Sequence, residues 1–131
     1  MRVFFNTNVL ISSLLFTGGR GEAALFRIIE GRDTLIISKP LLHELLTVLA
    51  NKFSHDREES ARVAVLLGDI AEMIHPKVHL QVLEDEPDNR VLECAMAGKA
   101  DVIVTGDKAI LQLGNYQGIR TLSLKNYLDQ N

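Results

Sequence analysis

Several residue types are scarce in this sequence of 131 residues, which has no tryptophan, three prolines and a single cysteine. Because Cys94 has no partner within the chain, no internal disulfide can form, which is typical of proteins from a reducing cytosol. Aromatic residues make up 5% of the chain and hydrophobic residues 47%. We therefore expect an aliphatic core that is large enough to be stable without disulfides. No repeat or low-complexity linker divides the chain, so we expect a single domain over residues 1–131.

Long hydrophobic stretches and an excess of positive charge are also missing. The apolar segment 9–16 is too short to span a bilayer, and no basic region of note precedes it. We expect no membrane association and a cytoplasmic location. The net charge is −3, whereas nucleic-acid-binding proteins usually carry the opposite sign. A cluster of carboxylates that binds a divalent cation would account for this deficit, so the charge weighs only mildly against a nucleic-acid substrate.

Apolar runs alternate with helical patterns along the chain. Runs typical of strands lie at residues 2–5, 34–38, 100–105 and 120–122, with a weaker one near 73–75. Helical patterns lie at residues 22–30, 40–51, 57–74 and 88–98. This alternation predicts βαβ units and a mainly parallel sheet with helices on both faces. The strands are continuous Val, Ile, Phe and Leu runs, as expected for strands that are covered on both faces.

Polar residues follow two of these strands. Asn6 comes directly after the first strand, and Asp107 follows the strand at 100–105. In open parallel sheets, ligands bind beyond the carboxyl ends of the strands. Glu44 lies on the first turns of the helix after a third strand, on its apolar side, where a carboxylate should be buried only if something pairs with it. Asp88 opens the helix that leads to the strand before Asp107. These four residues can converge at one end of the sheet.

Each of these residues also has a simpler interpretation. Asp88 is a plausible helix N-cap, and Asp107 suits a turn after Gly106. Glu44 fits a solvated helix face, and Asn6 can hydrogen-bond the turn that follows its strand. Only the joint placement of the four favours a functional site.

Converging carboxylates predict a metal site, because they repel one another and ionise together only beside a cation. Hard oxygen ligands select Mg²⁺ or Mn²⁺, and such ions stabilise the attacking and leaving oxygens of a phosphodiester displacement. The four histidines lack the spacing of a zinc site, and no phosphate-binding P-loop is present. The segment 18–21, Gly-Gly-Arg-Gly, matches no dinucleotide fingerprint, and we interpret it as a hinge.

These segments together resemble the PIN-domain nucleases, especially the toxin components of bacterial toxin–antitoxin pairs. The resemblance extends over almost the whole chain and is carried by residues 3–11, 38–45, 88–95 and 100–107. It implies a three-layer α/β/α fold and an endoribonuclease that uses Mg²⁺ or Mn²⁺ to cleave RNA. It also implies a homodimer or higher homo-oligomer and neutralisation by an antitoxin protein.

The resemblance also implies which residues form the site. In the family the opening motif is Asp-Thr-Asn, and its aspartate is a metal ligand, whereas this chain has Asn6 at that position. The residues implied as catalytic and metal-binding are Asn6, Glu44, Asp88 and Asp107, with Thr7, Asn8 and Thr105 in support. Asp101 is commonly acidic in relatives, and since it starts its strand we expect it at the opposite end, in a structural role. We expect Glu84, Asp85 and Glu86 to form a solvated loop, with Asp85 or Glu86 as competitors of Asp88.

The substitution at position 6 predicts an impaired enzyme. An amide oxygen can still coordinate Mg²⁺, but without the charge, so metal binding should be weaker and cleavage slight or absent. An engineered substitution and a natural degenerate member are both consistent with this sequence. Four basic residues near strand ends or acidic positions are candidates for phosphate contacts, although solvated surface charges are as good an interpretation of each. These are Arg20, Lys39, Arg90 and Lys108.

Two other functions compete with a nuclease. Phosphoryl transfer through an aspartyl phosphate needs a nucleophilic aspartate at a strand end, and Asn6 removes the best candidate. A catalytically inactive PIN-like module that binds RNA or protein is favoured by Asn6 if that residue is natural.

Overall fold

The computed structural model describes residues 1–130, which form a six-stranded sheet and seven helices. The strands are β1 (Arg2–Phe5), β2 (Thr34–Ser38), β3 (Ala71–Ile74), β4 (Val102–Val104), β5 (Asn115–Tyr116) and β6 (Ile119–Leu122). The helices are α1 (Thr7–Leu15), α2 (Arg20–Ile29), α3 (Lys39–Phe53), α4 (Arg57–Ile70), α5 (Glu86–Ala97), α6 (Lys108–Leu113) and α7 (Leu124–Leu128).

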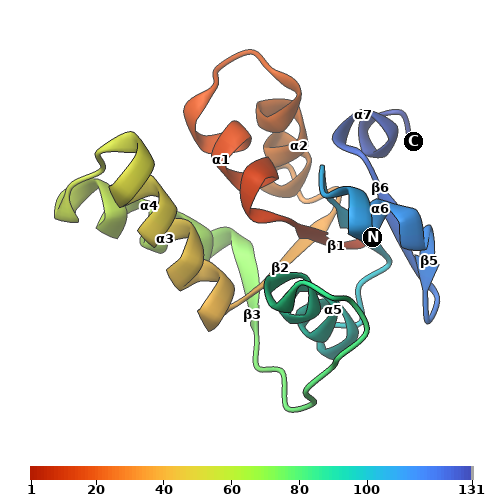
Figure 1. The fold of residues 1–131 in the computed structure, drawn as a ribbon. Coiled ribbons are helices and arrows are strands. Elements are labelled where there is room, and N and C mark those ends of the chain that lie inside the picture. Colours follow the sequence, from red (N-terminus) through yellow and green to blue (C-terminus); the bar gives the residue numbers. More distant parts are fainter. Residues whose placement is uncertain (131) are drawn as a thin grey trace.

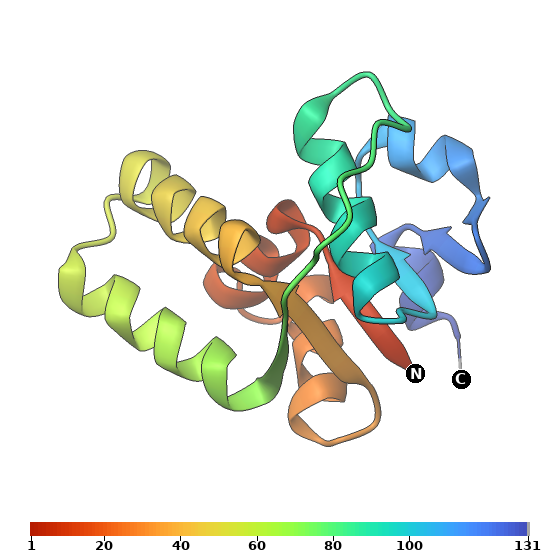
Figure 2. The same cartoon turned by 90° about the horizontal axis from the view of Figure 1, so that it is seen from below.

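The sheet is parallel except for β5, and its strand order is β3-β2-β1-β4-β6-β5. Helices α1, α2 and α7 lie on one face and α5 lies on the other, which gives three layers (Figures 1 and 2). The predicted α/β/α fold with a mainly parallel sheet is therefore confirmed. The central strands are buried on both faces, in agreement with their continuous apolar sequences.

The order of the strands determines where a ligand can bind. The chain runs outward from β1 through β2 to β3, and then returns to place β4 on the other side of β1. The strand order thus reverses between β1 and β4, and in open α/β sheets the crevice for ligands lies at such a point. Asn6 and Asp107 follow these two strands. The backbone N–H of Asn6 donates to the carbonyl of Val104 at 3.0 Å, which continues the β1–β4 pairing up to the crevice.

Three local predictions were wrong. The pattern at 57–74 divides at residue 70 into α4 and strand β3, because Ala71–Ile74 pair with β2. Asp88 does not cap α5, whose N-cap is Asp85 and whose first turn contains Pro87. The segment 18–21 is not a hinge over its whole length, because α2 begins at Arg20 and Gly21 is buried. A Cβ atom on Gly21 would lie 2.6 Å from the backbone nitrogen of Ser13, so α1 and α2 approach closely there.

Ion pairs fix the amino ends of the strands, far from the crevice. The carboxylate of Asp101 accepts the backbone N–H of Arg2 at 2.8 Å, which gives Asp101 the structural role that was expected. Asp33 accepts hydrogen bonds from the N-terminal ammonium and from the hydroxyl of Tyr127. Burial alone would raise the pKa of Asp33, but these two hydrogen bonds, together with the charges of the N-terminal ammonium and Arg27, hold the pKa below its ordinary value.

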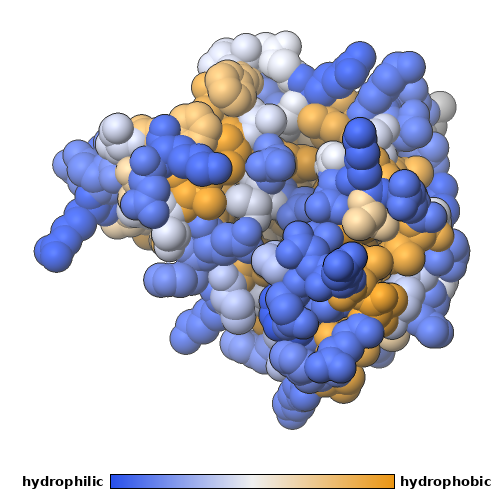
Figure 3. Space-filling model, in the orientation of Figure 1, coloured by the Kyte–Doolittle hydropathy of each residue, from blue (hydrophilic) through white to orange (hydrophobic). Residues whose placement is uncertain are grey.

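The surface is mostly hydrophilic on the face shown in Figure 3, where apolar areas show through between α1 and α3 and beside α5. Within residues 1–130, no single helix is long and apolar enough to cross a bilayer. Of the described helices, only α1 and α2 taken together have the length and apolar composition of a membrane span, and this pair is bent by 92°.

Candidate functional site

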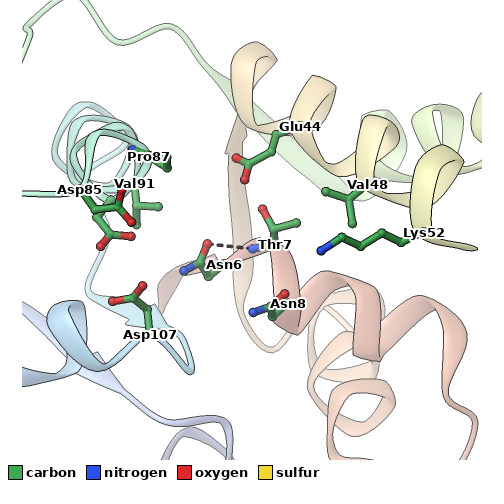
Figure 4. Close-up of a pocket in the computed structure, with 11 residues that line it drawn as sticks. Asn6, Thr7, Asn8, Glu44, Val48, Lys52, Asp85, Pro87, Val91 and Asp107 are labelled. Atoms are coloured by element: carbon green, nitrogen blue, oxygen red, sulfur yellow. Dashed lines mark hydrogen bonds between the residues drawn. The ribbon is translucent and has the colours of Figure 1, made fainter.

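A cavity of about 280 Å³ lies at the crevice between β1 and β4, and it contains all four residues of the predicted site. Figure 4 shows Asn6, Glu44 and Asp107 around a common space, and Asp88 also lines it. Asn6 follows β1, Glu44 lies on α3, Asp88 on α5 and Asp107 precedes α6. Thr7 and Asn8 also line the cavity, as does Asp85. Residues up to 101 positions apart in the sequence are thus brought together by the sheet order.

The side chain of Asn6 is held in one orientation. Its Oδ1 accepts the backbone N–H of Thr7 at 2.8 Å and thereby caps α1. Because a backbone N–H can only donate, the oxygen must face Thr7 and the amide nitrogen must face the other way. The Nδ2 group donates to Oγ1 of Thr105 at 2.8 Å. Position 6 is therefore rigid and its polar atoms are largely occupied.

Thr105 connects Asn6 to Asp107. Its fully buried Oγ1 accepts both the Asn6 amide and the backbone N–H of Asp107, the latter at 3.0 Å. A hydroxyl can accept two hydrogen bonds and also donate one, but within residues 1–130 no acceptor lies in range of its proton. An aspartate at position 6 would accept a hydrogen bond from the Thr105 hydroxyl. The hydrogen bond from the backbone N–H of Asp107 to Oγ1 of Thr105 would remain. The hydrogen-bond partners of residue 6 can thus accommodate a carboxylate as well as an amide, but a carboxylate would add negative charge to the cavity.

Asp88 experiences the strongest electrostatic perturbation in the cavity. Burial, followed by the charges of Asp107 and Asp85, raises its pKa from 3.8 to about 6, and Glu44 adds a smaller effect. The residue is 6% exposed, and a side-chain hydrogen bond with Asp107 contributes to the same rise in pKa. Such a carboxylate is unfavourable unless a cation or a donor comes to the cavity.

Asp107 and Glu44 differ in their surroundings. Asp107 is the N-cap of α6, since its Oδ1 accepts the backbone N–H of Ile110 at 3.1 Å. It is thus both the turn residue and a member of the site. Glu44 was predicted on the apolar side of its helix, but it is exposed, because the buried stripe of α3 consists of Leu41, Leu45 and Leu49. Glu44 instead points from the edge of that stripe into the cavity (Figure 4).

Two charged residues that line the cavity were not assigned to the site from the sequence. Asp85, interpreted mainly as a loop residue, lines the cavity beside Asp88. Lys52 also lines it and extends its ammonium group toward Asn8 and Thr7 (Figure 4). Lys52 could have been predicted from the sequence. It lies two steps of four residues after Glu44 on α3, and residues four apart share a helix face.

The four candidate basic residues are not equivalent in the structure. Lys108 lines a cavity that shares Asp85, Asp88 and Asp107 with the site. Arg20 lines a third cavity, which shares Asn8.

Arg90 donates to Glu93 at 2.8 Å and to Glu86 at 3.0 Å, so its charge is already paired within α5. Lys39 is exposed at the start of α3 and lines neither the site nor the two adjoining cavities. The structure thus removes Arg90 as a free phosphate ligand and places Lys39 outside the site.

The residues of the cavity fit a hard divalent cation in chemistry. They supply carboxylate and amide oxygens, and the pKa of Asp88 is raised by burial and then by the charges of Asp107 and Asp85. Within residues 1–130, no three His, Cys, Asp or Glu side chains are close enough to enclose a metal ion alone.

The sequence is similar to that of a curated protein, and the fold is similar to those of solved structures. The curated protein is the uncharacterized protein MJ1680 of Methanocaldococcus jannaschii, which is 27% identical over 132 residues, covering 95% of this chain and 84% of that protein. One of the structures is VapBC2 from Rickettsia felis bound to a DNA fragment from its promoter. That chain superposes with a TM-score of 0.64 at 15% identity, covering 94% of this chain and 98% of that chain, and supports the fold alone.

The match that decides the family is to the model of the PIN domain, and it covers residues 2–109. This range includes β1 through the start of α6, and hence every strand and helix that contributes to the cavity. The chain belongs to the PIN domain family.

Proposed function

We propose that this protein is an endoribonuclease of the PIN-toxin type whose activity is impaired by Asn6. Glu44, Asp88 and Asp107 would hold Mg²⁺ or Mn²⁺ with the amide of Asn6. The observation that carries this proposal is the convergence of these four residues in one cavity at the β1–β4 crevice. A bound ion would activate water and stabilise the charge of a phosphodiester displacement.

The residues of the chain supply positioning around that chemistry. Thr105 fixes residue 6 and the backbone of Asp107 through two hydrogen bonds, so that both stand at the same edge of the cavity. The elevated pKa of Asp88, caused by burial and then by Asp107 and Asp85, keeps the metal-free cavity partly protonated near neutral pH. A cation would displace that proton and return the carboxylate to its charged form.

The experiment is a comparison of RNA cleavage in Mg²⁺ or Mn²⁺ by the protein with Asn6 and by Asn6→Asp. We expect slight or no cleavage by the first and clear cleavage by the second, because the aspartate restores a charged ligand. Equal and robust rates would refute the role of position 6 as an essential ligand.

A second function is favoured by the same residue. If Asn6 is natural, the protein is a PIN-like module that binds RNA or a protein without cleaving it. Absence of cleavage by Asn6→Asp, together with retained RNA binding, would support this alternative.

The proposal includes partners. The structurally similar VapBC2 is a complex bound to its promoter DNA, and by analogy we propose that an antitoxin protein neutralises this chain in the cytoplasm. We further propose a homodimer or a higher homo-oligomer. Co-purification with the product of a short adjacent gene, and the mass in solution measured by light scattering, test these two proposals.

A further inference from the structure

The third cavity, which Arg20 lines, lies beside the acidic one and is lined by cations instead of carboxylates. Its volume is about 310 Å³, at the lower end of the range of ligand pockets. It shares Asn8 with the acidic cavity, and Gly106 on its wall directly precedes Asp107. A ligand in it would therefore be next to a phosphate held at the acidic site.

Two basic side chains line this cavity without any competing carboxylate. Arg20 begins α2 and Lys125 lies on α7, and both are exposed. Within residues 1–130 neither forms an ion pair. This distinguishes them from Arg90, whose charge is neutralised by Glu86 and Glu93. Arg20 and Lys125 are available for an anion such as a phosphate.

The rest of the lining is mixed. Val9 and Leu124 contribute apolar surface, and Ser12 and Ser123 contribute hydroxyl groups. No aromatic residue is among the lining residues, so a base would contact aliphatic side chains instead of stacking on a ring. This surface tolerates any base, because apolar contact carries no hydrogen-bond pattern.

The position of Arg20 is fixed by its neighbour. Gly21 packs so closely on α1 that an added Cβ would lie 2.7 Å from the carbonyl carbon of Ser12. The start of α2 is therefore held against the helix that carries Asn8 and Val9. Backbone packing therefore holds Arg20 at the cavity more firmly than a loose loop would hold a residue.

We propose that this cationic cavity binds the nucleotide adjacent to the scissile phosphate of a single-stranded RNA, with Arg20 and Lys125 on its phosphate. The inference rests on the proposed function, because it assigns a neighbouring subsite of the same substrate. Single-stranded RNA is the substrate class because a cavity of this size admits one nucleotide that has left the base stack, and not a duplex.

The test uses a short fluorescent single-stranded RNA and the full-length protein in Mg²⁺, with the RNA checked for integrity after each titration. Arg20→Ala and Lys125→Ala should each flatten the dependence of log affinity on log salt by about 0.7, the value for one lost phosphate contact on a single strand. Arg20→Lys and Lys125→Arg should restore most of the slope. Arg32→Ala is the matched control, since Arg32 is an exposed arginine just before β2, at the opposite end of the sheet.

Cleavage by the Asn6→Asp protein separates the subsite from the proposed function. In that background the two alanine variants should raise KM and leave kcat unchanged, because the contact stabilises the bound substrate and the transition state equally. Cleavage with parental KM and an unchanged salt slope would overturn the subsite and leave the nuclease intact. Failure of the parent to bind RNA, and of Asn6→Asp to cleave it, would overturn the proposed function and the subsite with it.

Discussion

Replacing Asp88 by asparagine should stabilise the metal-free protein at neutral pH. The carboxyl of Asp88 has a folded-state pKa of about 6, against an ordinary value of 3.8, chiefly because of burial and then because of Asp107 and Asp85. At about 1.4 kcal/mol for each tenfold change in proton affinity, this interval corresponds to about 3 kcal/mol. The cavity is open to water, and screening reduces the expected gain of Asp88→Asn to about 1–2 kcal/mol.

The sign of the effect depends on pH. A carboxyl whose pKa is raised by folding binds its proton more tightly in the folded state, so the protein loses stability as the pH rises from 3.8 toward 6. The cost of Asp88 is fully present above that interval and absent below it. Asp88→Asn should therefore be more stable than the parent at neutral pH, whereas the two proteins should be alike near the ordinary aspartate pKa.

The assay is urea denaturation in a chelator at both pH values, followed by circular dichroism. Asp69→Asn, which removes an exposed carboxylate on α4, is the matched control and should change stability by less than about 0.5 kcal/mol. Addition of Mg²⁺ should stabilise the parent more than Asp88→Asn. A loss of stability in Asp88→Asn at neutral pH, or an equal gain at both pH values, would refute the electrostatic account.

Three further predictions concern other parts of the protein. Asn6→Asp should lower the melting temperature in a chelator by adding repulsion to the cavity, and Mg²⁺ should reverse the change; an unchanged or higher temperature contradicts this. Gly21→Ala should cost about 1–3 kcal/mol in chemical denaturation, since its Cβ meets backbone atoms of α1, and a neutral effect would show that α2 can shift. Asp33→Asn should destabilise the protein by about 1 kcal/mol at neutral pH. Since folding lowers the pKa of Asp33, the difference in unfolding free energy between Asp33→Asn and the parent should decrease as the pH falls below the ordinary aspartate pKa. A difference that stays constant with pH would contradict this link between the pKa and stability.

The sequence predicted the central strands well because their signal is local. The bounds of β1 and β2 are those of the apolar runs, since both strands are covered on both faces. The end of α4 was not predictable in this way. The helical pattern continues through residues 71–74 and overlaps the weak strand signal near 73–75, and pairing with β2 makes this segment a strand.

The candidate site was predictable as a set of residues but not in its detail. Asn6 and Asp107 could be placed from the strand ends that precede them. The pairing of Arg90 could have been read from Glu86 and Glu93, which lie four residues before and three after it on the same helix. The exposure of Glu44 and the approach of Asp85 depend on how α3 and α5 are set against the sheet, which no local pattern encodes.

The hydroxyl of Thr105 has a consequence for the history of this protein. The hydroxyl can accept a hydrogen bond from an asparagine at position 6 or donate one to an aspartate there. The fold therefore tolerates either residue at that position without repacking. The codons of these two amino acids differ by a single base. A single point mutation therefore exchanges the two residues at position 6, and the hydrogen-bond partners Thr7 and Thr105 can serve either one.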